Sequence, residues 1–375
     1  MLAWNYQWFQ QGYAVPVTGQ SATPVTPVDI GILLPTLKAV RTNCHIADAK
    51  HATDYTLCVY LLKMREYYRW EQNIPFNEKL QHQELTEWLS SRENHWDSLQ
   101  ENEFEQVPVG DRQHDPFAAE TINQALNKLG YVYSSGYGRG MKPMFFLGAL
   151  ESLQTLNGYT LVVSGREYAR DLAAPPAMSQ GKTIFVRRES LRRMLWEKVE
   201  EWRWNKPANA MQNALGCYDF DNAVEQSLDA MTDNELQSAL LHEIGEVKAG
   251  ELLGSEWEAM LASLPNSKAE IMVRAVRDHL ADALSTLPGL LENRNTAALH
   301  FYIGNMTNMR KALFPELLTA YESWTDTGKT QALEQLAARS AAHWLLLAEK
   351  ILGLYQQQGD DCQTALIDLI EAHTL

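Results

Sequence analysis

The residues best suited to chemistry form a short polar run, His242-Glu243-Ile244-Gly245-Glu246. His242 and Glu246 are one helical turn apart, so a helix would place both side chains on the same face. A helix commonly offers two ligands to one metal ion in this way. Glu243 would point about 100° away, where it is positioned to act as a general base toward a metal-bound water. The run therefore predicts a hydrolase-like metal site.

A second polar group lies on the stretch that follows, which is also expected to be a helix. Asp278, His279 and Asp282 occupy adjacent positions of one stripe within an apolar sequence. Charges on so apolar a face must be paired, bound to a metal or neutralised. A short connection favours antiparallel neighbours, so the two polar groups are expected to face each other. The predicted ligands of a zinc, iron or manganese ion are His242, Glu246, Asp278, His279 and Asp282.

The same residues also allow a purely structural interpretation. The run resembles the HExxH helix of zinc metallopeptidases in its first half, but Glu246 stands where that family has its second histidine. This departure breaks the defining ligand pair and argues against a peptidase. In the alternative, His242 is hydrogen-bonded to Glu246, and the aspartates pair with Arg274 or Arg277. The chain would then be a non-catalytic binding or scaffold protein with a buried network of histidine and carboxylates.

Four further residues are weaker candidates for the same site. His45, Asp48 and His51 fall within about a third of the circumference of one upstream helix. They would complete a site with the later clusters, or they are ordinary polar groups of a first helical turn. His300 is a lone histidine in an apolar helix, a position that more often belongs to the core.

Arginines gather where the predicted sheet gives way to helix. Arg187, Arg188, Arg192 and Arg193 open a helix, where positive charge opposes the helix dipole. Such a placement requires nearby carboxylates or a bound anion. It predicts a pocket for an anionic or phosphorylated small molecule, recognised by arginine forks. The alternative is internal pairing with glutamates of the same helix and with the acidic C-terminal half.

Composition limits the classes of protein to consider. The 375 residues carry a net charge of −15, and 45% of them are hydrophobic, which is enough to bury a core. Residues 1–218 contain 22 basic and 23 acidic side chains, whereas residues 219–375 contain 10 and 24. An acidic surface disfavours nucleic acid as a partner. We find neither a membrane span nor a leader pattern, and four scattered cysteines without a CxxC pair, so we expect a cytoplasmic protein with reduced thiols.

The predicted fold is mainly α (α+β), a multi-helical body with a small antiparallel β-sheet insertion around residues 130–187. Thr232 and Glu235 have capping-box spacing, which predicts that a helix begins at Thr232 and ends at Gly254. Other expected helices include Thr296–Leu313. Three parts follow: an extended N-terminal arm (residues 13–36) plus helices over 1–125, a β-sheet region with an Arg- and Trp-rich helix over 126–218, and an acidic helical domain over 219–375. The alternative is that the three parts form one compact unit.

Longer strings carry a resemblance to a known family. They are residues 165–178 (GREYARDLAAPPAM), residues 187–197 (RRESLRRMLWE) and residues 241–246 (LHEIGE). Together they resemble an uncharacterised bacterial protein family that has no assigned activity, and the resemblance extends over most of the chain. It implies no function, substrate or oligomeric state.

Overall fold

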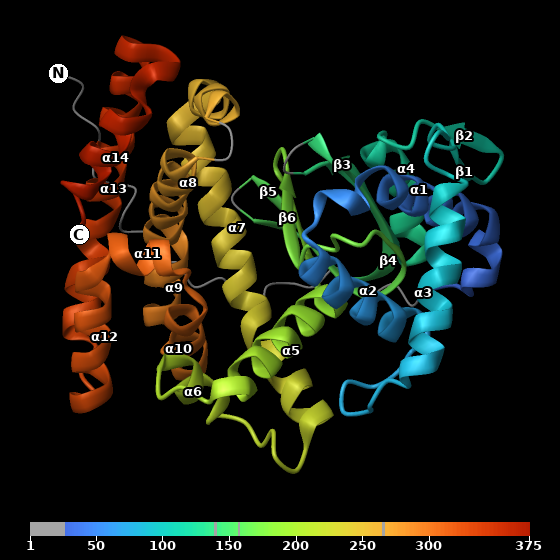
Figure 1. The fold of residues 1–375 in the computed structure, drawn as a ribbon, viewed down its shortest axis with the longest axis horizontal. Coiled ribbons are helices and arrows are strands. Elements are labelled where there is room, and N and C mark those ends of the chain that lie inside the picture. The colour runs from blue at the N-terminus through green and yellow to red at the C-terminus, as the bar shows by residue number, and fades with distance from the viewer. Residues whose placement is uncertain (1–26, 139–140, 157, 265–266) are drawn as a thin grey trace. The chain divides into compact units, whose positions relative to one another are not determined.

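The strands of residues 131–187 carry continuous runs of buried side chains and form one five-stranded sheet (Figure 1). The computed structural model describes residues 27–375 apart from 139–140, 157 and 265–266. The strands lie in the order β3-β4-β5-β7-β6. Their bounds are β3 Tyr131–Tyr137, β4 Pro143–Leu156, β5 Tyr159–Arg170, β6 Ala177–Gln180 and β7 Thr183–Arg187.

One strand pairing in this sheet is parallel. Strand β7 lies between β5 and β6, pairing in parallel with β5 and antiparallel with β6. The apolar side chains of β7 are buried, whereas β6 is partly exposed and takes the edge. The prediction of a mainly α protein with a β region around residues 130–187 is confirmed. The parallel pairing was not predicted, because local strand patterns do not encode which strand is central.

Successive side chains of a strand point to opposite faces of the sheet, and both faces are buried. On one face, Tyr133, Phe145 and Leu147 pack with Val40 and Cys44 of helix α1 (Leu34–His51). On the other face lies a second apolar cluster: Val132, Phe146, Leu150, Val162 and Phe185. The other α-helices and strands described within the first 205 residues are α2 Leu57–Glu71, α3 His82–Asp97, β1 Val107–Val109, β2 Arg112–His114, α4 Ala119–Leu126 and α5 Arg188–Asn205.

The expected extended arm over residues 13–36 lies largely outside the described residues, which begin at residue 27. Where the structure describes it, the prediction is wrong from residue 30 onward. A 3-10 helix covers Ile30–Leu33, and α1 follows without a gap. The side chain of Asp29 accepts a hydrogen bond from the backbone N–H of Gly31 at 2.9 Å, which caps this turn.

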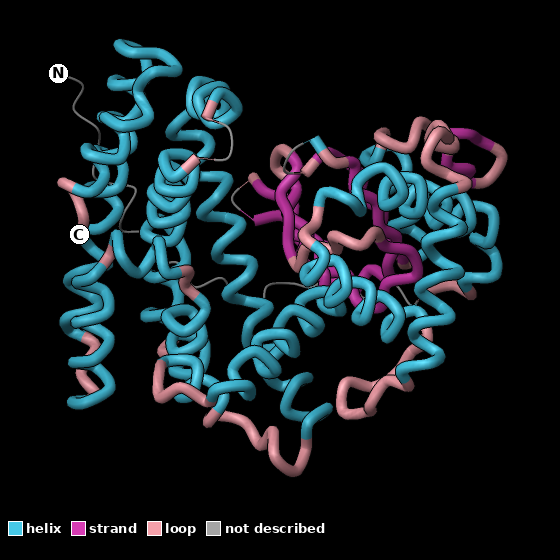
Figure 2. Tube along the Cα trace, in the orientation of Figure 1, coloured by secondary structure: helices cyan, strands magenta, loops and turns pink. Residues whose placement is uncertain are grey.

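All regular structure after α5 is helical in the described part of the chain (Figure 2). A large apolar core includes Trp257, Phe314 and Trp344. The helices are α6 Ala210–Leu215, α7 Val224–Ser263, α8 Lys268–Ala281, α9 Leu287–Glu292, α10 Thr296–Asn305, α11 Asn308–Leu313, α12 Pro315–Thr327, α13 Gln331–Gln358 and α14 Gln363–Glu371, with a π-helical turn over Asp282–Thr286.

Helix α7 begins earlier than the capping box predicts. Thr232 lies inside the helix, and its hydroxyl donates to the carbonyl of Leu228 at 2.6 Å. The predicted start is therefore wrong, because the buried Leu228 and Met231 continue the helical apolar pattern backwards. The predicted end coincides with a break, since Gly254 has φ 71° within α7. The prediction of a single helix over residues 296–313 is also wrong, because the structure has two helices there, α10 and α11.

The chain divides into two compact units. Among the described residues, the first unit contains 27–200 and 219–233, and the second contains 201–218 and 234–375. Helices α5 and α7 each contribute residues to both units. None of the described helices has the length and apolar character that crossing a membrane would require.

Candidate functional site

The structure brings His242 of α7 and Asp282, at the end of α8, into contact within the second unit. Asp282 Oδ1 lies 2.9 Å from His242 Nδ1 and accepts a hydrogen bond from the Thr286 hydroxyl at 2.8 Å. Asp282 Oδ2 accepts from the guanidinium of Arg310, on α11. Both oxygens of this carboxylate, which is 2% exposed, are therefore used inside the protein.

The pKa shifts follow from this pairing. Burial opposes the charge of Asp282, but Arg310 and His242 outweigh it and hold the pKa of this carboxyl well below its usual range. Burial lowers the pKa of His242, whereas the hydrogen bond and charge of Asp282 raise it, to a net value of about 9. At neutral pH two cations, His242 and Arg310, therefore flank the Asp282 anion. Arg310 was not predicted, because it lies on a third helix.

A close crossing of α7 and α8 makes this contact geometrically feasible. A Cβ atom on Gly245 would overlap the backbone carbonyl of Ala281. Only glycine therefore fits at this position without moving one helix. Gly245 therefore allows the close packing of α7 against α8, a role that the adjacent residues in the sequence do not indicate.

The other predicted ligands have different partners. Glu246 Oε2 lies 3.2 Å from the guanidinium of Arg277, which also lies 3.7 Å from Glu258. Burial raises the pKa of Glu243 to about 7, although His242 partly offsets this effect. Burial likewise raises the pKa of Asp278, which Arg310 partly offsets.

His279 is part of the aromatic core. Its Nε2 lies 3.0 Å from the carbonyl oxygen of Arg310. Because a carbonyl oxygen only accepts, Nε2 is protonated and donates this hydrogen bond. The ring stacks on Trp344 with centroids 4.6 Å apart and contacts Phe314 edge-on. Burial lowers the pKa of His279 to about 3, which keeps it neutral.

These contacts do not assemble the predicted metal ligands. Among the described residues, no group of three or more His, Cys, Asp and Glu side chains is arranged to hold a metal ion. Arg310 provides Asp282 with the positive charge that a metal would have supplied. The metal-dependent hydrolase therefore stays a prediction, whereas the expected network between the two polar groups is present with different pairings.

The secondary candidates have local partners. His45 lies 2.8 Å from the guanidinium of Arg92 through its Nε2. Asp48 Oδ1 accepts from the backbone N–H of Leu172 at 2.8 Å, and His51 lies 3.2 Å from Asp54. These three residues belong to the first unit, whereas His300, in the second unit, contacts the hydroxyl of Tyr321 at 2.8 Å.

The predicted arginines are largely paired internally. Arg187 is fully buried and makes two 2.8 Å hydrogen bonds to Glu167. Arg188 bonds to Glu151 and Asp233. Arg192 pairs with Glu225 and Asp229, while Arg193 pairs with Glu197 and donates to the carbonyl of Ala174. Internal pairing, the alternative interpretation, thus accounts for most of this cluster.

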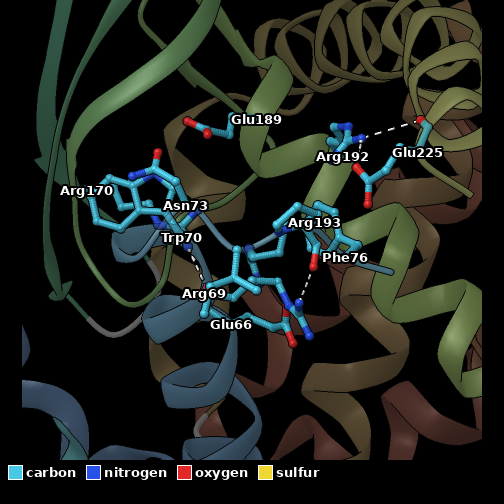
Figure 3. Close-up of a pocket in the computed structure, with 12 residues that line it drawn as sticks. Glu66, Arg69, Trp70, Asn73, Phe76, Arg170, Glu189, Arg192, Arg193 and Glu225 are labelled. Carbon is cyan, nitrogen blue, oxygen red and sulfur yellow. Dashed lines mark hydrogen bonds and ion pairs between the residues drawn. The ribbon is translucent and has the colours of Figure 1, made fainter. Parts of the chain in front are cut away.

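Arg192 and Arg193 nevertheless line a cavity of about 260 Å³ within the first unit (Figure 3). The cavity lies between α2, the loop that follows it, the end of β5, α5 and the start of α7. Arg69 and Arg170 add two guanidinium groups that the sequence pattern did not connect with this cluster. The other lining residues are Glu66, Trp70, Asn73, Ile74, Pro75, Phe76, Glu189 and Glu225.

Arg170 is the least satisfied cation of this cavity. Its side chain is 3% exposed, and its guanidinium lies 4.4 Å above the ring of Trp70. One terminal nitrogen donates to the carbonyl of Glu66 at 3.3 Å, and the other lies 3.8 Å from Glu167. Its Nε has no hydrogen-bond partner among the described residues. Burial lowers the pKa of Arg170 to about 10, with Glu167 opposing this effect.

Comparison with protein families places the chain in a family whose function is unknown. Residues 36–187 match the N-terminal domain and residues 192–373 the C-terminal domain of the family of unknown function DUF6866. The chain belongs to this family and contains both domains in order. A search of the curated proteins and a search of the solved structures found no match.

Proposed function

We propose that this protein is a non-catalytic binding protein that takes a small anionic ligand into the arginine-lined cavity of the first unit. The observation that carries the proposal is Arg170, a nearly fully buried cation that lines the cavity and whose contacts to Glu66 and Glu167 are long, at 3.3 and 3.8 Å. A buried charge without full pairing costs several kcal/mol, on the order of 3–5 when one partner is missing. A bound anion would supply short, charge-assisted hydrogen bonds.

A second guanidinium supports the same ligand. Arg193 uses its terminal nitrogens for Glu197 and Ala174, while its Nε has no hydrogen-bond partner among the described residues. The lining residues include four arginines and three glutamates, so fully ionised side chains give a net charge of +1. This balance favours an anion over a cation.

The lining residues also favour binding over catalysis. They contain no histidine, cysteine, serine, threonine, tyrosine or lysine among the part of the chain that the structure describes. Nucleophilic catalysis relies mainly on those side chains, and three glutamates are the only proton-transfer groups among the described lining residues. Arginine remains charged and serves chiefly to hold an anion in place.

Calorimetric titration with inorganic phosphate, succinate and 4-methylpentanoate tests the proposal. We expect saturable binding of at least one of these anions, and at least tenfold weaker binding by Arg170→Gln, because about 1.4 kcal/mol corresponds to a factor of ten. Arg188→Gln removes an arginine that lies outside the cavity and is expected to leave the affinity unchanged. Absence of binding by every anion at millimolar concentration would overturn the proposal.

A substitution at the cavity mouth avoids the risk that Arg170→Gln fails to fold. Asn73 is exposed, has φ 53° and lines the cavity. Asn73→Asp keeps a residue type that tolerates this backbone conformation and adds negative charge, so we expect several-fold weaker anion binding. Asn73→Gly keeps the backbone conformation without the charge and is the control. Equal affinities of the two variants would contradict an anion site.

A further inference from the structure

The cavity contains a carboxylate without an ion pair, Glu189, and a cation, Arg170, whose ion pair with Glu167 is long at 3.8 Å. Glu189 accepts hydrogen bonds from the backbone N–H of Glu167 at 2.6 Å and from the side chain of Trp70. Burial and the charge of Glu167 raise the pKa of Glu189, while Arg170 lowers it. Among the described residues, no Lys, Arg or His nitrogen lies within the 4.0 Å that defines an ion pair with Glu189.

Arg170 and Glu189 influence each other's charge without touching. The charge of Glu189 raises the pKa of Arg170, and Arg170 lowers that of Glu189, yet the two groups form no ion pair. In Figure 3 both residues lie toward one side of the cavity, and Arg192 with Glu225 lies toward the other. The other two glutamates already form ion pairs: Glu66 with Arg65 and Arg69, and Glu225 with Arg192.

A ligand that carries both charges would satisfy both groups at once. We infer that the cavity takes a zwitterionic α-amino acid, whose carboxylate bonds to Arg170 and whose ammonium group bonds to Glu189. This inference rests on the proposed anion site and specifies that the bound anionic group is the carboxylate of a zwitterion. The adjacent charges of an amino acid match a cation and a carboxylate that face one space without closing on each other.

The size and walls of the cavity indicate a small apolar side chain. A volume of about 260 Å³ lies just below the roughly 300–1,000 Å³ of pockets that hold drug-sized ligands, which indicates a small ligand. Four lining residues, Trp70, Ile74, Pro75 and Phe76, present apolar surface. Leucine has the required size and polarity.

Three compounds separate the contributions of the two charges. Calorimetry compares leucine with 4-methylpentanoate, which lacks the ammonium group, and with 3-methylbutylamine, which lacks the carboxylate. We expect leucine to bind at least tenfold more tightly than 4-methylpentanoate, and the amine to show no binding. If 4-methylpentanoate binds as tightly as leucine, the amino-acid inference falls while the anion-binding proposal stands. If leucine, 4-methylpentanoate and phosphate all fail to bind, or if only the amine binds, both fall.

Glu189→Gln tests the assigned role of the carboxylate. Glutamine keeps an oxygen for the backbone N–H of Glu167 but removes the negative charge. We expect leucine affinity to fall at least tenfold, to about that of 4-methylpentanoate, while the affinity for 4-methylpentanoate is retained. Glu151→Gln, which changes a carboxylate paired with Arg188 outside the cavity, is the control. Equal loss of both ligands in Glu189→Gln would show a merely structural role and overturn the inference.

Discussion

The two units treat their buried charges differently. In the second unit, Asp282 is surrounded by His242, Thr286 and Arg310, and both of its oxygens are used. In the first unit, Arg170 and Glu189 line a cavity and remain incompletely paired. Both clusters place charged groups in apolar surroundings, where an unpaired charge is costly.

The difference separates a structural network from a binding site. Arg310 pairs directly with Asp282, and only its Nε lacks a hydrogen-bond partner among the described residues, whereas Arg170 has one long ion pair and lines a cavity. Residue types alone do not distinguish the two cases, since each contains carboxylates and arginine. The pairing of the individual atoms does.

The largest effect is expected from opening the closed network. Asp282→Asn leaves the charge of Arg310 buried without its carboxylate, which should cost about 3–4 kcal/mol of unfolding free energy. Urea unfolding followed by circular dichroism measures the loss. Asp278→Asn makes the same chemical change one turn earlier on α8, where the side chain is only half-buried, and should cost less than about 1 kcal/mol. Equal losses in the two variants would contradict a network centred on Asp282.

A buried carboxyl on α7 provides the opposite case, since its charge has a net cost. Glu235 is 2% exposed, and burial raises its pKa from 4.5 to about 7, with Ser238 partly offsetting this. The folded protein therefore retains a proton that the unfolded chain loses above pH 4.5. The free energy of unfolding should fall by about 3 kcal/mol as the pH rises from 4.5 to 7. Above pH 7 the contribution of Glu235 should change little.

Glu235→Gln removes that titration. The variant should show a smaller decrease in unfolding free energy between pH 4.5 and 7 than the unmodified protein, and it should be the more stable of the two at pH 8. Urea unfolding at a series of pH values tests this, with the exposed Glu256→Gln on the same helix as the control. Parallel pH profiles for the unmodified protein and Glu235→Gln would show that the charge of Glu235 is compensated in the fold.

The sequence predicted those parts of the fold that depend on local pattern. The β region of residues 131–187 follows from short β-branched or aromatic runs between turn residues, and most of the helices follow from helical periodicity. The start of α7 did not, because Thr232 and Glu235 have capping spacing but lie within a longer apolar pattern. The parallel pairing of β7 with β5 depends on which strand is buried, which is a property of the whole sheet.

The candidate sites were predictable only where both partners lie on neighbouring helices. The meeting of His242 with Asp282 was expected from a short connection, but Arg310 comes from α11 and changes the chemistry of the group. Similarly, Arg192 and Arg193 were identified as a charge cluster. Arg170 joins them from the end of β5, with Trp70 from α2, so the cavity arises from contacts distant in sequence.

The smallest expected effect concerns the helix crossing that allows the closed network to form. Gly245→Ala would push a methyl group into the carbonyl of Ala281, so α7 and α8 must separate at a cost of about 1–3 kcal/mol. Gly250→Ala is the matched control on the same helix, because its new methyl group would meet only the Arg277 guanidinium at 3.8 Å. There the gain in helix propensity should stabilise by up to about 1 kcal/mol. Similar changes in urea midpoint would mean that the network does not depend on this close approach.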